Sequence, residues 1–543
     1  GPSHDPLPGL PGESSDERTD TAALNLWMGP NEPAQSVPGL RYVRRSSRDI
    51  ASSGRILLGR HIASSHLHRM VRICLQNLAQ GSCHSLITRR GSIDIGKAVA
   101  RRMFAYQRDM HRKLMTHMKI ALIVHGVSDQ ALLGGPGPVA IEQAKALVAR
   151  GHEVRIVTTD LVWKGQRAKL PTFDLVRPFG ASVEYSKAWS FRGWPGSVGP
   201  IISPGSHALI RHAVDWADLT HAHEWSYATV QLARRLCRRT GKPFVAQPHG
   251  SIQHRDPGWN NLMHRAFNVA NRVGPDEVFI ALSHAESVEI AESLGRSPRI
   301  HELVNPMPSV LVSESEEKRL DRRAGWGCPP DARVLLYAHR LAPNKGLDIA
   351  IAALPHLPPT TYLVVVGPDS VAPAFTAECR SLSARLGVES RVKFMGPAPR
   401  REMTDIINTC DVFVLPARRD TFPMSVLQAL ACGRPTVITD TCQIAEAVAG
   451  AVLVSTPDPV AFAQSISSLD VAESSRLGAA AKRLVLERFS PEVVGERLEA
   501  IYEETMNTFA SRARSRVRSG GRSRARSRSG AWSRDSGSPG GPS

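Results

Sequence analysis

The polar residues with the most informative spacing lie in PARRDTFPMSVLQALACGRPTVITD, residues 416–440. Asp420 falls in a loop after an apolar run, and a helix is predicted to begin between Thr421 and Met424. Gln428 then lies one turn into that helix. Because the first turn of a helix leaves backbone N–H groups without partners, it can bind an anion. The stretch therefore predicts a phosphate-sized site with Asp420 and Gln428 on either side.

The expected donors to that anion are the backbone amides of Met424, Ser425 and Val426. Asp420 could accept hydrogen bonds from ligand hydroxyls beside them. An alternative interpretation is that Asp420 only caps the helix and Gln428 is a surface residue. This stretch alone does not choose between the two.

Two cations form a second candidate, in the stretch AHRLAPNKG. Arg340 ends a predicted strand and Lys345 follows a Pro-Asn turn, so both are expected at the sheet edge that carries the helix amides. Together they could neutralise a diphosphate, Arg340 by paired hydrogen bonds and Lys345 as a point charge. The alternative is that both are solvated loop residues.

The elements that must position these groups alternate between strand and helix. A first series of apolar runs covers residues 119–125, 153–159, 219–223, 243–250 and 277–283. A second covers residues 333–340, 361–367, 391–396, 410–416, 435–440 and 451–455. Helical stretches separate the runs, such as the one that ends at Gly151. Continuous apolar strands with intervening helices indicate parallel sheets covered on both faces, so the predicted fold class is α/β with two doubly wound domains.

The two ends of the chain differ from this middle part. Residues 1–117 hold 17 Lys and Arg against 9 Asp and Glu, and residues 510–543 hold nine Arg against one Asp, so most of the net charge of +18 belongs to the flanks. Neither flank has a sustained apolar period, and we expect both to be disordered. The leader is interpreted as an extension upstream of Met118, with a transit peptide as the alternative. A closing helix is predicted to begin at Pro491, capped by Ser490.

Composition excludes several classes of protein. The eight cysteines show neither a CxxC pair nor metal-ligand spacing, and a reducing compartment fits them. No apolar run approaches the roughly 20 residues that a membrane helix needs. We therefore expect a globular, cytoplasmic protein.

The order of HRLAPNKGLDIAIAAL, RVKFMG and CDVFVLPARRDTFPMSVLQALACGRPTVITD resembles the nucleotide-sugar-dependent glycosyltransferases of family 4, also called group 1. The resemblance spans about residues 118–508 and implies the GT-B fold, in which two Rossmann-like domains face each other across a cleft. The implied organisation is a leader, an acceptor domain, a nucleotide-sugar domain, a closing helix and a tail, over residues 1–117, 118–305, 306–489, 490–509 and 510–543.

The resemblance also implies a donor site. In the family, a Gly-Arg pair and a Lys-Gly pair hold the donor diphosphate; Arg340, Lys345 and Gly346 match, and His339 replaces the first glycine. The family's two glutamates, which meet the donor sugar and the ribose, correspond to Asp420 and Gln428. Asp keeps the charge, whereas Gln only keeps a hydrogen-bond acceptor. The helix start between them completes the implied donor site with Thr421, Phe422, Met424, Ser425 and Val426.

The first half of the chain adds a loop, HGVSDQALLGGPGPVA, that resembles a family loop whose Gly-Gly approaches the donor phosphates. The matching residues are Gly134 and Gly135. The loop also imitates a GxGxxA dinucleotide fingerprint, which needs its first glycine at the end of the strand. About ten residues separate Val124 from Gly135, and this spacing disfavours a dinucleotide site.

Three histidines are the remaining candidates in this half. His249 in AQPHG matches a family histidine that lies under the donor sugar, although a structural histidine is the alternative. His221 and His223 are expected on one face of a strand, because side chains alternate along it, unless the strand ends between them. Only one of the two is expected to face the cleft.

The resemblance implies retaining transfer of a hexose from a nucleotide diphosphate sugar to a hydroxyl of a saccharide or lipid-linked acceptor. We expect no metal or other cofactor, because Arg340 and Lys345 supply the positive charge and no Asp-x-Asp cluster lies near either sheet edge. The implied catalytic residues are His249, Arg340, Lys345 and Asp420. A catalytically inactive nucleotide-sugar-binding partner is the alternative, and would explain Gln428. Nucleic-acid binding through the basic tail is a weaker alternative, and the motif order disfavours an epimerase.

Acceptor choice is expected to lie in the aromatic and basic segment 161–200. Its Trp, Tyr, Lys and Arg residues could stack on sugar rings or meet anionic lipid headgroups. A lipid-linked acceptor would bring the protein to the inner face of the membrane as a peripheral protein. The alternative is that these residues only pack a loop onto the domain.

Overall fold

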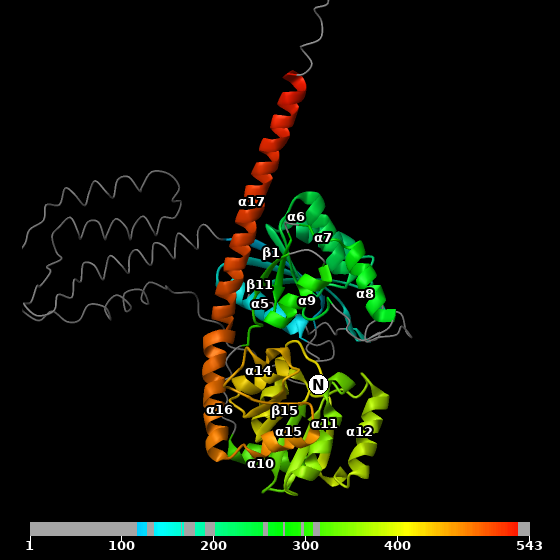
Figure 1. Cartoon of the computed structure of the whole chain (residues 1–543), viewed down its shortest axis with the longest axis vertical. Coiled ribbons are helices and arrows are strands. Elements are labelled where there is room, and N and C mark those ends of the chain that lie inside the picture. Colours follow the sequence, from blue (N-terminus) through cyan, green and yellow to red (C-terminus); the bar gives the residue numbers. More distant parts are fainter. Residues whose placement is uncertain are drawn as a thin grey trace, which may run out of the picture. The chain divides into compact units, whose positions relative to one another are not determined.

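Two series of short apolar strands form two parallel sheets, with helices in the connections between strands (Figure 1). The computed structural model describes residues 117–127, 135–163, 166–167, 180–190, 201–252, 259–274, 277–294, 298–307 and 315–529. Both sheets belong to one contact unit, Arg112–Ser543. The other unit, Gly1–His111, lies outside the described residues, as does most of the predicted leader.

The first sheet has seven strands in the order β11-β10-β9-β8-β1-β2-β5. They are β1 Lys119–Gly126, β2 Glu153–Thr159, β5 Ser182–Ser186, β8 Leu219–His223, β9 Phe244–Gln247, β10 Val278–Ala281 and β11 Arg299–Glu302. The five predicted strands of this series are confirmed. Apolar runs do not predict β5 and β11, the two edge strands, because SVEYS and RIHE consist mainly of polar residues.

The second sheet has six strands in the order β14-β13-β12-β15-β16-β17. They are β12 Arg333–Ala338, β13 Thr361–Val366, β14 Val392–Gly396, β15 Val412–Leu415, β16 Thr436–Thr439 and β17 Leu453–Ser455. All pairings in both sheets are parallel. The predicted class, two doubly wound α/β sheets, is therefore confirmed.

The connections supply the helices. Those of the first sheet are α5 Pro136–Ala149, α6 Ser206–Trp216, α7 Ala228–Thr240, α8 Trp259–Ala270 and α9 His284–Leu294. The later ones are α10 Glu316–Gly325, α11 Leu347–Ala353, α12 Pro373–Arg385, α13 Met403–Thr409, α14 Met424–Ala431, α15 Pro459–Ser467, α16 Val471–Leu484 and α17 Pro491–Ser529. Single turns are η4 Pro343–Lys345, η5 Leu354–His356, η6 Glu389–Arg391, η7 Arg400–Glu402, η8 Gln443–Ala445 and η9 Val485–Phe489. Two small antiparallel pairs join β3 Leu161–Trp163 to β4 Gln166–Arg167 and β6 Trp189–Ser190 to β7 Ile201–Ile202.

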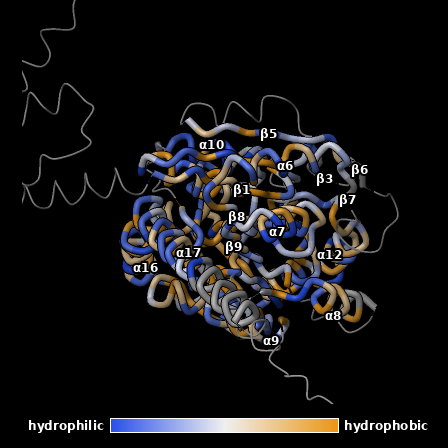
Figure 2. Tube along the Cα trace, turned by 90° about the horizontal axis from the view of Figure 1, so that it is seen from above, coloured by the Kyte–Doolittle hydropathy of each residue, from blue (hydrophilic) through white to orange (hydrophobic). Residues whose placement is uncertain are grey.

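Alternate residues of β1 show how the first sheet is covered on both faces. Ile120 and Leu122 belong to one buried apolar cluster, whereas Ala121 and Ile123 belong to a second. This is the period of two that a strand imposes on its side chains. Figure 2 shows hydrophobic colour along β1 and its neighbours, bordered by helices such as α7 that mix hydrophilic and hydrophobic residues.

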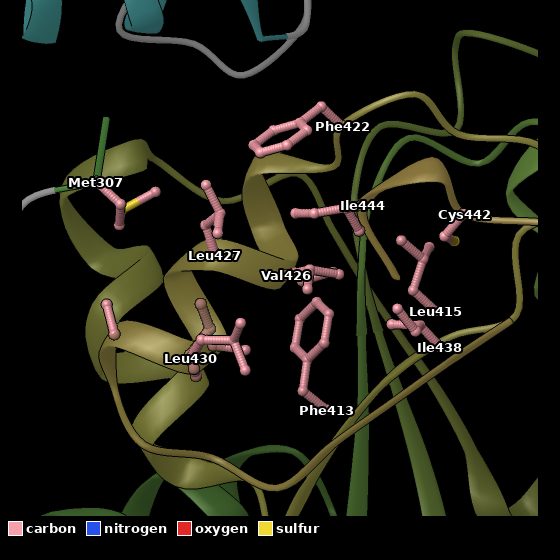
Figure 3. Close-up of a cluster of buried hydrophobic side chains, with 14 of the residues drawn as sticks. Met307, Phe413, Leu415, Phe422, Val426, Leu427, Leu430, Ile438, Cys442 and Ile444 are labelled. Carbon is pink, nitrogen blue, oxygen red and sulfur yellow. The ribbon is translucent and has the colours of Figure 1, made fainter. Parts of the chain in front are cut away.

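Helix α14 packs on the second sheet through the small and branched residues of its sequence MSVLQALA. Val426, Leu427 and Leu430 are fully buried and lie beside Phe413 of β15 in the cluster drawn in Figure 3. Gly433, with φ +68, follows the helix. Burial of one such side chain stabilises the fold by about 1.5–3 kcal/mol. The beginning of α14 is therefore held in place by its own core face.

Helix α17 is longer than the sequence predicts. Ser490 caps it, with Val493 N–H donating to the Ser490 Oγ at 3.4 Å, as expected. The helix then continues to Ser529, beyond the predicted closing helix of residues 490–509; residues 530–543 lie outside the described part. Extending a formed helix costs far less than nucleating one, and the sequence after Pro491 holds no further proline before Ser529.

One side of α17 packs against α5 of the first sheet. Arg150 Nε donates to Glu499 Oε2 at 2.7 Å, and His152 Nε2 lies 3.3 Å from Glu499 Oε1. A Cβ at Gly495 would lie 2.9 Å from the Ala146 Cβ, so the two helices approach closely there. Within the described residues, no helix is long and apolar enough to span a bilayer.

Candidate active site

The two sheets share one topological feature. In the second, the chain adds β13 and β14 on one side of β12 and then returns to place β15, β16 and β17 on the other. The first sheet reverses in the same way between β1 and β8. Open α/β sheets bind ligands outside the carboxyl ends of the strands at such reversals. His339 and Arg340 follow β12, and Asp420 lies in the loop after β15, at the reversal of the second sheet.

Lys345 and Asp420 form a buried ion pair at this reversal. Lys345 Nζ lies 2.5 Å from Asp420 Oδ2, and the two side chains are 6% and 10% exposed. His339 Nε2 lies 3.4 Å from the same oxygen. Burial opposes ionisation of Asp420, but Lys345 and His339 together hold its pKa well below the ordinary range. Burial lowers the pKa of His339 to about 4, so at neutral pH the pair is charged and the imidazole is neutral.

Arg340 stands next to this pair. Its N–H donates to His339 Nδ1 at 2.9 Å, and its carbonyl accepts from the Tyr337 hydroxyl at 3.3 Å. The Arg340 Nε is buried and has no hydrogen-bond partner among the described residues. A guanidinium with an unused donor can bind an anion.

Gly346 fixes the turn that carries Lys345. Its φ is +70, it ends η4, and it immediately precedes α11. A Cβ at this position would lie 1.8 Å from the Pro416 carbonyl oxygen. The loop after β12 and the loop after β15 can therefore approach each other only with glycine here, which brings Lys345 to Asp420.

The first turn of α14 lies directly after Asp420. Of the three amides predicted to be free, that of Val426 is not, because it donates to the Pro423 carbonyl at 3.1 Å. This hydrogen bond spans only three residues, and its acceptor, Pro423, has an extended conformation and directly precedes the first helical residue. The amides of Met424 and Ser425 make no backbone hydrogen bond to the described residues. The Ser425 Oγ is likewise buried without a partner there.

The other predicted donor-site residues lie around the same turn. Phe422 is 7% exposed and its ring centroid lies 6.3 Å from that of Phe489, so it packs in the core. Thr421 lies against Gly250, where a Cβ would meet the Thr421 Oγ1 at 2.4 Å. Gln428 is partly buried one turn into α14.

His249 lies at the carboxyl end of β9 in the first sheet. Its φ of +54 is a left-handed backbone conformation, which is uncommon for a residue with a side chain. Its Nε2 lies 2.9 Å from the His223 Nδ1. Burial, followed by the neighbouring His223, holds the pKa of His249 well below its usual range, so the ring is neutral.

His221 and His223 both lie in β8 and both are buried, with rings stacked at 4.6 Å between centroids. They share one face, as the alternation of a strand requires. His223 contacts His249, whereas His221 Nδ1 lies 2.7 Å from the Tyr502 hydroxyl of α17. Only His223 therefore reaches the candidate site, and His221 connects the sheet to α17.

Glu286 of α9 supports the loop of His249, and the sequence analysis does not identify it. Its carboxylate accepts from the Gly250 N–H at 2.5 Å and from the Leu282 N–H at 2.7 Å. Burial raises its pKa to about 7. No motif marks this residue, because the two amides reach it only after β9 and β10 pair.

A second set of residues that the sequence analysis misses lies at the reversal of the first sheet. His125 is the second-last residue of β1, Glu224 follows β8, and Tyr227 precedes α7. The rings of His125 and Tyr227 stack with centroids 3.9 Å apart. Burial lowers the pKa of His125 to about 3 and raises that of Glu224 to about 8. The available signal was the position of Glu224 directly after a predicted strand.

Two predicted regions are covered only in part. Gly134 lies outside the described residues, whereas Gly135 precedes α5 and a Cβ there would lie 3.3 Å from the Met424 Cγ. Gly135 therefore approaches the start of α14. Most of the segment 161–200 also lies outside the described residues, so its role remains a prediction.

Two family profiles match the chain. The profile described as Glycosyltransferase Family 4 matches residues 133–307, and the profile described as Glycosyl transferases group 1 matches residues 332–470. Together they cover more than half of the sequence. The chain belongs to the group 1 glycosyltransferases of family 4. The predicted family is thereby confirmed, and so is its activity at the level of sugar transfer.

Curated relatives of this glycosyltransferase include two named D-inositol 3-phosphate glycosyltransferase. That of Xylanimonas cellulosilytica is 28% identical over 374 residues, which are 64% of this chain and 87% of the relative. That of Streptomyces bingchenggensis is 26% identical over 399 residues, which are 69% of this chain and 86% of the relative.

Solved structures with the same fold include Anabaena Alr3699/HepE in complex with UDP and glucose, with a TM-score of 0.58, 22% identity, and coverage of 72% of this glycosyltransferase and 100% of that chain. Sucrose-phosphate synthase from Thermosynechococcus elongatus has a TM-score of 0.55 and 18% identity, and covers 72% and 99%. These likenesses confirm the GT-B fold.

Proposed function

We propose that this glycosyltransferase moves a hexose from a nucleotide diphosphate sugar to a hydroxyl of a saccharide, polyol or lipid-linked acceptor, with retention of configuration at the anomeric carbon. The observation that carries the proposal is the set of groups at the reversal of the second sheet. Lys345, the unpartnered Nε of Arg340 and the free amides at the start of α14 all stand in the loops after β12 and β15, or directly beyond them.

These groups suit a leaving diphosphate for a physical reason. The charge on the leaving oxygen grows in the transition state, and fixed cations and N–H groups stabilise that growing charge without reorganising. One such donor lowers the barrier by about 3–4 kcal/mol when it is preorganised and shielded from water. Because Arg340 and Lys345 supply the positive charge, we expect transfer to proceed without a divalent ion and to be unaffected by EDTA.

The ion pair between Lys345 and Asp420 gives the donor a second point of attachment. Asp420 is a charged acceptor, and hydroxyls of the transferred sugar can donate to its second oxygen while Lys345 remains on the first. Gln428, one turn along α14, would accept a hydrogen bond from the ribose. His249 would lie beneath the donor sugar and, being neutral, would present no competing charge.

The departing diphosphate oxygen would take the proton of the acceptor hydroxyl on the same face of the sugar. No protein nucleophile is then needed, and the products are the glycoside and the protonated nucleoside diphosphate. Supporting context comes from the relatives: one solved structure of this fold is titled as a complex with UDP-glucose, and the curated relatives are named D-inositol 3-phosphate glycosyltransferase.

The test is a panel of nucleotide sugars on the full chain. A bound donor raises the unfolding temperature in proportion to its affinity and concentration. We expect one class of nucleotide sugar to stabilise the protein and to be hydrolysed slowly in the absence of acceptor, with release of the nucleoside diphosphate. NMR of the transferred product would then report retention at the anomeric carbon.

An inactive binding partner is the second candidate, because Gln428 replaces a charged family residue. Its signature is stabilisation by the donor with no hydrolysis and no transfer. Absence of both stabilisation and turnover with every donor would contradict each of the two proposals.

A further inference from the structure

The reversal of the first sheet carries a carboxyl group that the donor site does not use. Glu224 directly follows β8 and Asp420 lies in the loop after β15, and each of these strands is the first beyond the reversal of its sheet. Ligands bind outside the strand ends at both kinds of position. The first sheet is the half in which we expect the acceptor, and this inference therefore rests on the proposed function.

The backbone of Glu224 is held in an unfavourable conformation. Its φ is +70, and among the described residues other than glycine only Glu224 and His249 have a positive φ. A left-handed conformation costs a residue with a side chain about 1–2 kcal/mol. The Glu224 N–H donates to the Gln247 carbonyl at 2.7 Å, which holds the turn against β9. Strain of this kind concentrates at functional sites.

Several fully buried glutamates elsewhere have evident structural roles, whereas Glu224 is only partly buried. Glu277 pairs with Arg234 and Arg238, Glu499 pairs with Arg150, and Glu286 accepts two backbone amides. The Glu224 carboxyl forms neither an ion pair nor a hydrogen bond with the residues that the structure describes. It does not cap α7 either, because that helix has no side-chain cap.

Tyr227 shows what the carboxyl lies near. Burial raises the pKa of Tyr227 well above its usual value, Glu224 raises it further, and Arg340 lowers it. The Tyr227 hydroxyl is therefore within electrostatic reach of the acid after β8 and of the guanidinium after β12. Because its ring stacks on His125, this hydroxyl is held in place. The hydrogen bond from the Glu224 N–H to Gln247 also places Glu224 beside the strand end that leads to His249 and Gly250, and Gly250 lies against Thr421 of the donor loop.

We propose that Glu224 binds the acceptor, accepting a hydrogen bond from the hydroxyl that attacks or from its neighbour on the same sugar or polyol. A carboxyl oxygen at a strand end is a directional acceptor for a hydroxyl. The residue orients the acceptor toward the anomeric carbon and takes no part in holding the diphosphate. The substrate class assigned to this side of the site is a polyhydroxylated acceptor bound through its hydroxyls.

Water can stand in for the unidentified acceptor, so hydrolysis of the donor tests the proposal. The assay uses the full chain with the nucleotide sugar that stabilises it most, and follows kcat for hydrolysis together with the Kd of the corresponding nucleoside diphosphate. Glu224→Ala and Glu224→Gln are compared with Glu184→Gln, which removes a partly exposed acid that pairs with Arg155.

We expect Glu224→Ala to lower kcat for hydrolysis at least tenfold, with Kd of the nucleoside diphosphate within twofold of the unmodified protein. Glu224→Gln keeps a carbonyl acceptor and should retain more activity than the Ala variant, and Glu184→Gln should change neither quantity. Should Glu224→Ala not fold, the Gln variant decides through a loss of at least threefold in kcat at constant Kd.

Unchanged kcat in the folded Glu224 variants would overturn the inference, as would a parallel loss of nucleoside diphosphate affinity. Equal losses in the Ala and Gln variants would overturn a hydrogen-bonding role. Failure of the unmodified protein to bind any nucleoside diphosphate is a different result: it would overturn the proposed function, and this inference with it.

Discussion

The reversals of the two sheets have the same topology and opposite electrostatics. At the second sheet, Lys345 and Asp420 are buried as a charged pair, with Arg340 beside them. At the first sheet, burial suppresses charge: His125 and His223 have pKa values lowered to about 3, and the pKa of Glu224 is raised to about 8.

This difference teaches how one architecture can serve two substrates. A diphosphate requires compensating charge, and charges survive burial only when they are paired and hydrogen-bonded. Hydroxyls require directional hydrogen-bond partners, and neutral partners can be buried without a counter-ion. The account therefore assigns donor charge to the second sheet and acceptor hydroxyls to the first.

Gly346→Ala should have the largest effect on the charged reversal of the second sheet, where Lys345 and Asp420 form their ion pair. The left-handed backbone would cost about 1–2 kcal/mol, and overlap with the Pro416 carbonyl would add about 1–3 kcal/mol more. Gly387→Ala is the matched control, because its φ is +66 and nothing lies within 4 Å of the added Cβ. Urea unfolding of both variants measures the difference, and equal losses would show that the approach of the two loops is not tight.

Lys345→Ala should lower turnover about 100-fold, the usual loss for one preorganised donor. It should also destabilise the protein, since Asp420 is left buried without its main partner. The matched control is Arg418→Ala, in the loop that carries Asp420, which breaks a more exposed ion pair with Asp348 of α11. Steady-state rates with the stabilising donor check this, and a rate for Lys345→Ala equal to that of the control would remove Lys345 from the mechanism.

Glu224, at the reversal of the first sheet, predicts a pH effect on the free energy of unfolding. The pKa of Glu224 is raised, so the folded chain keeps a proton that the unfolded chain loses between about pH 4.5 and pH 8. Stability from this group therefore falls as pH rises through that window and levels off above it. The unfolding free energy at pH 8 minus that at pH 5 should be more positive in Glu224→Gln than in the unmodified protein, because the contribution that falls with pH is removed.

Neighbouring groups contribute slopes of both signs, so the comparison with Glu224→Gln is what isolates this carboxyl. The lowered pKa values of His125, His223 and His249 make stability rise with pH, whereas the raised pKa of Glu286 makes it fall, as that of Glu224 does. Asp420 behaves in the opposite sense, because its pKa is lowered and its contribution is lost only in strong acid. An unchanged slope in Glu224→Gln would mean that the carboxyl is not neutral at pH 7.

Gln428→Glu gives the smallest expected effect, and it tests whether this position contacts the ribose of the donor. If this position meets the ribose, a carboxylate should accept a stronger hydrogen bond and tighten nucleoside diphosphate binding by about three- to tenfold, or roughly 0.7–1.4 kcal/mol. Calorimetric titration measures the change. A Kd that does not move would place Gln428 outside the ribose contact.

Sequence patterns predict most of the framework and the charged side. The strand order along the chain follows from apolar runs, and Arg340, Lys345 and Asp420 stand at strand ends that those runs define. The ion pair itself is not predictable, because it depends on Gly346 allowing two loops to meet. The engaged amide of Val426 is likewise set by the geometry of Pro423 and not by residue type.

The site at the reversal of the first sheet is harder to predict from sequence. Glu224 and His125 carry no motif, and their character comes from burial at the reversal of a sheet whose strand order is known only from the structure. Glu286 acts on amides from two different strand ends. Helix α17 also exceeds its prediction, since composition alone does not reveal that a formed helix will propagate into the Arg/Ser-rich region.

The most direct test of the charged reversal compares a nucleoside diphosphate with its monophosphate by calorimetric titration. The base is the one that the donor panel selects, and the proteins are the unmodified chain, Lys345→Ala, Arg340→Ala and the control Arg418→Ala. The account predicts at least tenfold tighter binding of the diphosphate, retained in Arg418→Ala and largely lost in the other two variants. Equal affinities for diphosphate and monophosphate, or a preference unaffected by Lys345→Ala and Arg340→Ala, would contradict it.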